Sequence, residues 1–106
     1  MTLSELRTQL LTLGMPAEYG GFINSPTPPY IIYVHAYSAD MIADNQNYVD
    51  IGNFQIELYT VKKDPTSEGL VEALLKSLRL PYLKVEAFID SLKLRQVVYQ
   101  IQLIGG

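Results

Sequence analysis

Residues 47–78 join an alternating strand to an amphipathic helix, and this join constrains the fold more than any other part of the sequence. Apolar and polar residues alternate over residues 54–59, which is typical of a strand with one buried face. Asp64 is a favoured helix N-cap and Pro65 a favoured first helical residue, so a helix is predicted to begin here. Its apolar residues recur at helical spacing and form a stripe of Leu70, Val71, Leu74, Leu75 and Leu78.

The strand of this unit is expected over residues 47–61. Its apolar positions are predicted to face the core, namely Phe54, Ile56 and Leu58. The positions between and after them are predicted to face away from the core, namely Gln55, Glu57 and Tyr59. Upstream, Val49 and Ile51 have the opposite parity from Phe54, so a β-bulge is expected at Gly52.

The N-terminal part is predicted to contain a helix, a connector and a strand. Thr2 and Glu5 have the spacing of a capping box, and leucines at helical intervals then predict a helix over residues 3–13. Residues 15–29 contain a Gly-Gly pair and several prolines, so they are expected to be irregular. Residues 30–37 are rich in β-branched and aromatic side chains, which predicts a central strand or one covered on both sides.

The C-terminal part is predicted to form a hairpin. Residues 82–89 alternate weakly and are interpreted as a strand, although a helix also fits their spacing. Residues 94–104 are predicted to be a strand that is a candidate for pairing between subunits at a sheet edge. Its core-facing positions are expected to be Val97, Tyr99, Ile101 and Leu103.

The 106 residues are expected to form one domain over residues 1–106. The order helix, strand, strand, helix, strand, strand predicts an α+β fold. We expect a four-stranded, mainly antiparallel sheet with both helices on one face.

Composition excludes several functional classes. The chain has no cysteine, so disulfides, thiolate metal sites and cysteine nucleophiles are absent. Its net charge of −3 gives no electrostatic footprint for nucleic acid. No segment approaches the roughly 20 apolar residues of a membrane helix, and the N-terminus lacks the pattern of a signal peptide. A soluble intracellular protein is expected.

The sequence shows no convincing catalytic or metal-binding constellation. His35 is the one histidine, and an enzyme centred on it with Asp40 or Asp44 is an alternative hypothesis. The spacing of Asp40, Asp44 and Asp50 does not match a calcium-binding loop. We therefore expect a protein that is not an enzyme and needs no metal or cofactor. A further alternative is a nucleic-acid-binding or regulatory module that uses Lys62 and Lys63.

Outward strand faces rich in glutamine and tyrosine indicate an interaction surface, because charge-poor faces suit subunit contacts. An ordinary polar sheet surface is the competing explanation. The candidate interface residues are Gln55, Glu57, Tyr59, Lys62, Lys63, Gln100 and Gln102.

Residues 28–103 resemble the small tail-completion, or tail-terminator, proteins of long-tailed bacteriophages and prophages. The similarity lies in a proline-led, tyrosine-rich strand, an Ala-Asp-Asn loop, the strand QIELYT, the turn KKDP, an amphipathic helix, the segment LPY and the closing strand VVYQIQL. The resemblance implies an α+β subunit that assembles into a homo-oligomeric ring, typically a hexamer, at the head-proximal end of the tail. Such a ring stops polymerisation of the tail tube protein and contacts the head connector protein.

The resemblance implies no enzyme activity and no cofactor. It also implies that the protein is present in the cytoplasm of the bacterial host during assembly and afterwards in the tail of the virion.

Overall fold

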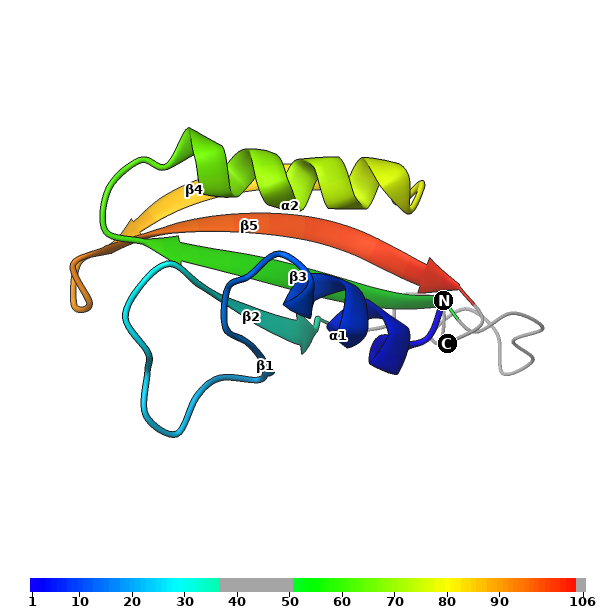
Figure 1. Cartoon of the computed structure of the whole chain (residues 1–106), viewed down its shortest axis with the longest axis horizontal. Helices are drawn as coiled ribbons and strands as arrows, with labels where there is room; N and C mark the ends of the chain where they lie inside the picture. Colours follow the sequence, from blue (N-terminus) through cyan, green and yellow to red (C-terminus); the bar gives the residue numbers. More distant parts are fainter. Residues whose placement is uncertain (37–50, 105–106) are drawn as a thin grey trace.

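A computed structural model describes residues 1–36 and 51–104 (Figure 1). Its elements are α1 (Leu3–Leu11), β1 (Ala17–Tyr19), β2 (Tyr30–His35), β3 (Ile51–Thr60), α2 (Pro65–Ser77), β4 (Leu83–Ile89) and β5 (Leu94–Ile104). The loop expected over residues 38–46 and the first part of the strand expected from residue 47 lie outside the described residues.

The protein has an α+β fold with a five-stranded mixed sheet in the order β1-β2-β3-β5-β4. The prediction of four mainly antiparallel strands is wrong in one respect, because β1 forms a fifth strand parallel to β2. β1 lies within residues 15–29, which were expected to be irregular, and it has only three residues. A strand this short has no recognisable alternation in its sequence. It is identified by its pairing with β2, in which Ala17 lies opposite Ile31.

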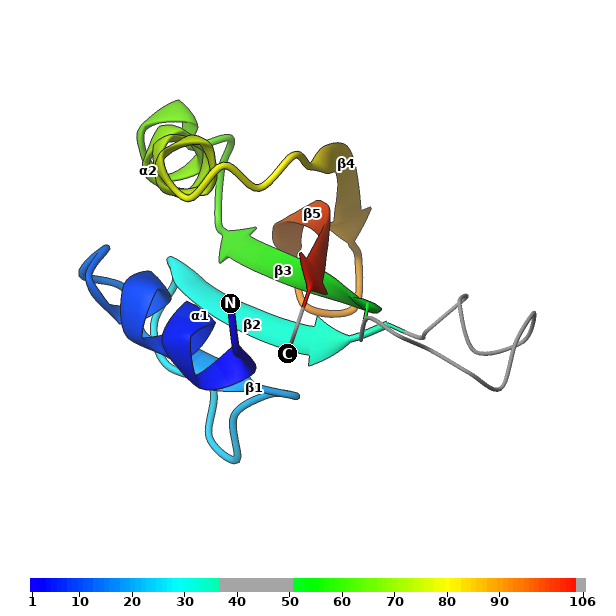
Figure 2. The ribbon, with the colours of Figure 1, turned by 90° about the vertical axis from the view of Figure 1, so that its right-hand side faces the viewer.

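Both helices lie on the same face of the twisted sheet, as predicted (Figure 2). Leu6 and Leu10 of α1 and Val71 and Leu75 of α2 are fully buried against it. The strands contribute the other side of this core, chiefly Ile31, Tyr33, Ile56, Leu58, Val97, Tyr99, Ile101 and Leu103. The opposite face of β2, β3, β5 and β4 carries no described helix.

The first helix begins at the predicted capping box and ends earlier than residue 13. The Thr2 backbone N–H donates to Glu5 Oε1 at 2.8 Å, and the Glu5 N–H donates to Thr2 Oγ1 at 3.1 Å. At the other end, the Thr12 N–H bonds to the Gln9 carbonyl, three residues back. This tighter turn ends the α-helix at Leu11, before Gly14 adopts a φ of +83°.

The second helix starts as predicted, but its buried face differs from the expected stripe. Asp64 caps it by accepting from the Ser67 N–H at 3.0 Å. Leu70 is 42% exposed, whereas Glu68 is only 4% exposed. The face that meets the sheet therefore runs through Glu68, Val71 and Leu75. Leu70 was part of the predicted apolar stripe but lies outside this face, so the stripe is wrong at this position.

The third strand pairs with β5 without interruption from Ile51 opposite Ile104 to Thr60 opposite Arg95. The expected β-bulge at Gly52 is therefore absent. Gly52 instead lies beside the ring of Phe54, two residues further along the same strand face.

The last two strands form the predicted hairpin, and the helical alternative for residues 82–89 is wrong. The expectation that β5 lies at an edge is also wrong, because β5 lies between β3 and β4. The two edge strands are β4 and β1.

Candidate interaction surface

The sheet face opposite the helices is covered by no described helix (Figure 2). We call it the open face. Its positions on β2, β3, β5 and β4 are fixed by the strand register and are Tyr30, Ile32, Val34, Asn53, Gln55, Glu57, Tyr59, Leu94, Gln96, Val98, Gln100, Gln102, Leu83, Val85, Ala87 and Ile89. Glu57 is the one charged residue among them. Burying this face in an interface would therefore remove only one ionised side chain from water, which keeps the desolvation cost low.

Five of the candidate interface residues meet on this face: Gln55, Glu57, Tyr59, Gln100 and Gln102. Gln55 lies directly opposite Gln100, and neither side chain makes a hydrogen bond within the described residues. Gln102 Nε2 donates to Asn53 Oδ1 at 3.0 Å. Each of the two unbonded amides keeps one acceptor and two donor hydrogens for a partner.

Tyr59 is the centre of a more buried cluster at one end of the open face. Its ring stacks on Tyr30 with centroids 5.1 Å apart, and Phe22 meets the edge of Tyr30 at 5.4 Å. Its hydroxyl donates to Glu57 Oε1 and accepts from Gln96 Nε2, both at 2.8 Å. Burial, followed by the bond to Glu57, raises the pKa of Tyr59 to about 12, so this residue acts as a neutral donor.

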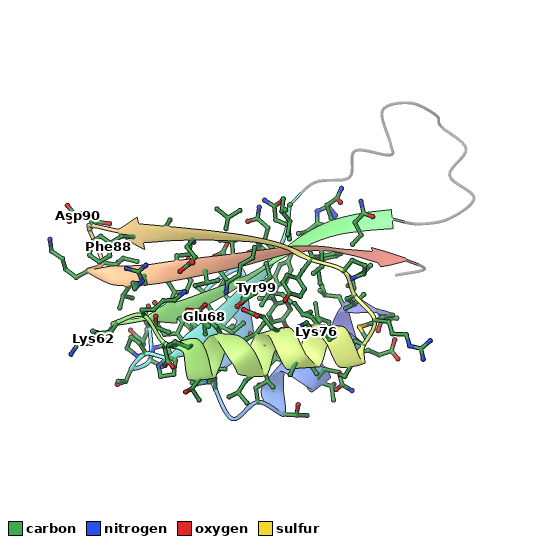
Figure 3. All side chains as sticks on the ribbon, turned by 90° about the horizontal axis from the view of Figure 1, so that it is seen from above. Lys62, Glu68, Lys76, Phe88, Asp90 and Tyr99 are labelled. Atoms are coloured by element: carbon green, nitrogen blue, oxygen red, sulfur yellow. The ribbon has the colours of Figure 1, made fainter. Side chains whose placement is uncertain are left out.

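The two candidate lysines do not lie on the open face. Lys62 is exposed at the turn after β3, where its side chain points away from the sheet (Figure 3). Lys63 Nζ lies 2.9 Å from Glu68 Oε1 and 2.7 Å from Glu86 Oε1. Lys63 therefore belongs to a second group of residues, on the helix side of the sheet.

This second group is a charge network that joins α2 to β4. Lys84 Nζ lies 2.8 Å from both Glu68 Oε1 and Glu72 Oε2, and the Tyr99 hydroxyl donates to Glu72 Oε2 at 2.9 Å. Figure 3 shows Glu68 and Tyr99 between the helix and the sheet. Sequence reasoning missed Lys84 and Glu86. Lys84 and Glu86 are two residues apart and so lie on one face of β4, and Glu68 and Glu72 are one turn apart on α2. These two spacings together could have predicted ion pairs between the strand and the helix.

The network shifts the ionisation of its members in the directions expected for ion pairs. The bond to Lys84 holds the pKa of Glu72 below its usual value, although partial burial opposes this. Bonds to Glu68 and Glu72 raise the pKa of Lys84. Burial, and then the bond to Glu72, raises the pKa of Tyr99. All of these shifts stabilise the charged carboxylate and ammonium and the neutral phenol, which suits a structural network.

A largely apolar groove of about 930 Å³ lies where α2 ends beside the ends of β3 and β5. Phe54, Leu80, Tyr82 and Leu103 contribute to its wall, and Arg79 has the one charged side chain among the described residues that line it. The described residues of the groove include no carboxylate or imidazole side chain.

The histidine hypothesis stays a prediction. His35 is exposed at the end of β2, and its ring meets the edge of Phe54 with centroids 5.0 Å apart. Asp40, Asp44 and Asp50 lie outside the described residues. Within the described part of the chain, no three histidine or acidic side chains are placed to hold a metal ion.

None of the described helices is long and apolar enough to cross a membrane. The sequence matches no protein-family model, and it matches no curated protein.

Proposed function

We propose that this protein is a non-enzymatic assembly subunit that forms a ring, typically of six copies, at the head-proximal end of a phage tail. The ring terminates the tail tube and joins it to the head connector. The observation that carries the assembly role is the open face, with one charge and two unbonded amides at Gln55 and Gln100. The sequence resemblance supplies the phage tail as the setting, with the host cytoplasm as the place of assembly.

A contact between subunits accounts for the composition of the open face better than solvent does. Glutamine amides and tyrosine hydroxyls can bond across an interface without the desolvation cost of ionised groups. Val34, Val98 and Val85 add apolar area between these polar groups. A closed ring needs two different complementary surfaces on each subunit, and the open face is our candidate for one of them.

The nucleic-acid alternative gains no specific support. Lys63 is paired with Glu68 and Glu86, which leaves Lys62 as the one lysine of the pair without an ion-pair partner in the described residues. A single exposed lysine is a weak phosphate-binding site compared with a basic stripe.

The oligomeric state of purified protein tests the assembly role. Multi-angle light scattering and native mass spectrometry are expected to show a ring of the wild-type chain, with concentration dependence. Gln100→Lys places a charge in the centre of the open face and is expected to shift the protein from the ring towards smaller species. Ala73→Lys, on the exposed side of α2, is the matched control and should leave the assembly unchanged. Equal assembly of Gln100→Lys and wild type would contradict the use of the open face.

The phage role is tested separately in a lysogen that carries the gene. Deleting the gene is expected to give overlong tails that are not joined to heads, as seen by electron microscopy. Normal tails and infectious particles from the deletion strain would contradict the proposed function.

A further inference from the structure

In the part of the chain that the structure describes, the outer edge of β4 is open along the whole strand. β4 pairs with β5 on one side, and within the described residues no strand pairs with its other side. Leu83 is 63% exposed, Val85 47% and Phe88 52%. The salt bridges of Lys84 to α2 place the helix over the inner face of β4, so α2 does not cover the edge (Figure 2).

This edge also lacks most features that prevent strands from pairing. It contains no proline and no bulge, because its register with β5 runs unbroken from Leu83 to Ile89. It has seven residues, which is long for an exposed edge, and Lys84 is its one lysine. Free backbone donors and acceptors on such an edge are a template for another strand.

We propose that β4 pairs antiparallel with β4 of a second copy of this chain, about a two-fold axis at Val85. This register places Lys84 of each copy opposite Glu86 of the other and gives two reciprocal ion pairs. It also places Leu83 opposite Ala87, so apolar side chains meet on the open face.

Two registers can be compared: the one centred on Val85 and the one in which all seven residues of both β4 strands pair. The charges on β4 favour the register centred on Val85. Full overlap is centred on Glu86 and sets two like charges directly opposite each other, which is destabilising. A shift of one residue to Val85 replaces that repulsion with the two Lys84–Glu86 pairs. Opposite charges directly across a strand pair stabilise it, so this register is the favoured one.

Both charged groups can accept the additional partner. An ammonium has three donor hydrogens, and Lys84 uses two of them on Glu68 and Glu72. Glu86 Oε1 bonds to Lys63 at 2.7 Å, and a carboxylate has about four acceptor positions. The pairing therefore extends the charge network across the two-fold axis without breaking a bond inside the subunit.

The two-fold contact goes beyond the proposed ring. Self-pairing of one edge is isologous and cannot by itself close a ring, so it is a second contact in addition to the ring interface. The axis runs perpendicular to the sheet, which keeps both helix layers on one side. The two five-stranded sheets then become continuous, and their open faces form one larger surface.

Disulfide trapping tests the proposal, because the natural chain has no cysteine. In the proposed register the two Val85 Cα atoms are about 4.5–5.5 Å apart, within the range that a disulfide spans. Val85→Cys is expected to form a covalent dimer under mild oxidation, as seen on a non-reducing gel. Ala87→Cys is the matched control, since it lies on the same face but about 13 Å from its counterpart. We expect it to cross-link about tenfold more slowly or less.

A double variant fixes the register independently. Leu83→Cys with Ala87→Cys is expected to cross-link as readily as Val85→Cys, because each position faces the other across the axis. Equal rates for Val85→Cys and Ala87→Cys, or no dimer from Val85→Cys in folded protein, would overturn the proposal. Circular dichroism establishes that each variant is folded. These results do not depend on Gln100 or on tails, so failure here is distinguishable from failure of the proposed ring.

Discussion

The ring of Phe54 lies against Gly52, so closely that a Cβ atom at Gly52 would be 2.6 Å from Phe54 Cε2. Both residues are on β3, where the chain pairs with β5 without a bulge. The glycine therefore serves side-chain packing, since it leaves room for the Phe54 ring beside its own backbone. The same ring also contacts the ring of His35, the last residue of β2.

Gly52→Ala is expected to destabilise the protein, because the added methyl group forces the Phe54 ring out of its place. Overpacking of this kind costs about 1–2 kcal/mol, and the ring is half-buried, so the lower end is expected. Urea unfolding followed by circular dichroism measures the change.

Gly69→Ala is the control, because it is expected to change the free energy of unfolding in the opposite direction. Gly69 lies inside α2, and a Cβ atom there would meet nothing within 4 Å. The substitution is expected to stabilise the protein by about 0.5–1 kcal/mol through helix propensity. A stabilising Gly52→Ala would contradict the packing role of Gly52.

Glu68→Ala is expected to lower the free energy of unfolding, because it removes the buried carboxylate that Lys63 and Lys84 share. Loss of a fully buried partner costs about 3–5 kcal/mol, but both lysines are partly exposed, so about 1–2 kcal/mol is expected. Asp90→Asn is the control, since the Asp90–Lys93 pair is fully exposed and its loss should leave the unfolding midpoint unchanged. Equal effects of the two substitutions would show that the network does not stabilise the fold.

Much of the fold could be predicted from local pattern, whereas the buried face of α2 could not. Asp64 and Pro65 fixed the start of α2, and alternation placed Ile56 and Leu58 in the core. Helical spacing alone did not distinguish a face through Leu70 from one through Glu68. The difference arises because Lys63 and Lys84, from other segments, compensate the Glu68 charge.

The candidate surface shows the same division between local and long-range information. Alternation grouped Gln55 and Tyr59 on β3 and Gln100 on β5, and the strand register brought these residues together. Lys63 directly follows β3 in sequence, and local pattern alone therefore predicts it beside these residues. Its partners on α2 and β4 draw it to the other side of the sheet, and this required knowledge of the tertiary fold.

The stability gained from Glu72 is expected to depend on pH. The ion pair with Lys84 depresses the pKa of Glu72 in the folded state below the ordinary value of 4.5. A depressed carboxyl pKa stabilises the fold above the unfolded pKa, and this contribution is lost as the pH falls through the folded pKa. Glu72→Gln should therefore be less stable than wild type at pH 7, and the difference should shrink below about pH 4.5. Urea midpoints measured from pH 7 to pH 3 would test this, and a constant difference would contradict it.

The short strand β1 depends on a contact from α1, which gives a final prediction. Arg7 Nη1 lies 2.8 Å from Glu18 Oε1 and donates to the Tyr33 hydroxyl at 3.3 Å, so it bridges α1, β1 and β2. Three residues of parallel pairing are a weak attachment without such a contact. Arg7→Leu keeps apolar bulk and removes the donors. It should increase amide exchange of residues in β1 while leaving exchange in β5 unchanged, because local opening does not require global unfolding. Equal acceleration in β1 and β5 would indicate a global loss of stability and contradict the local role of Arg7.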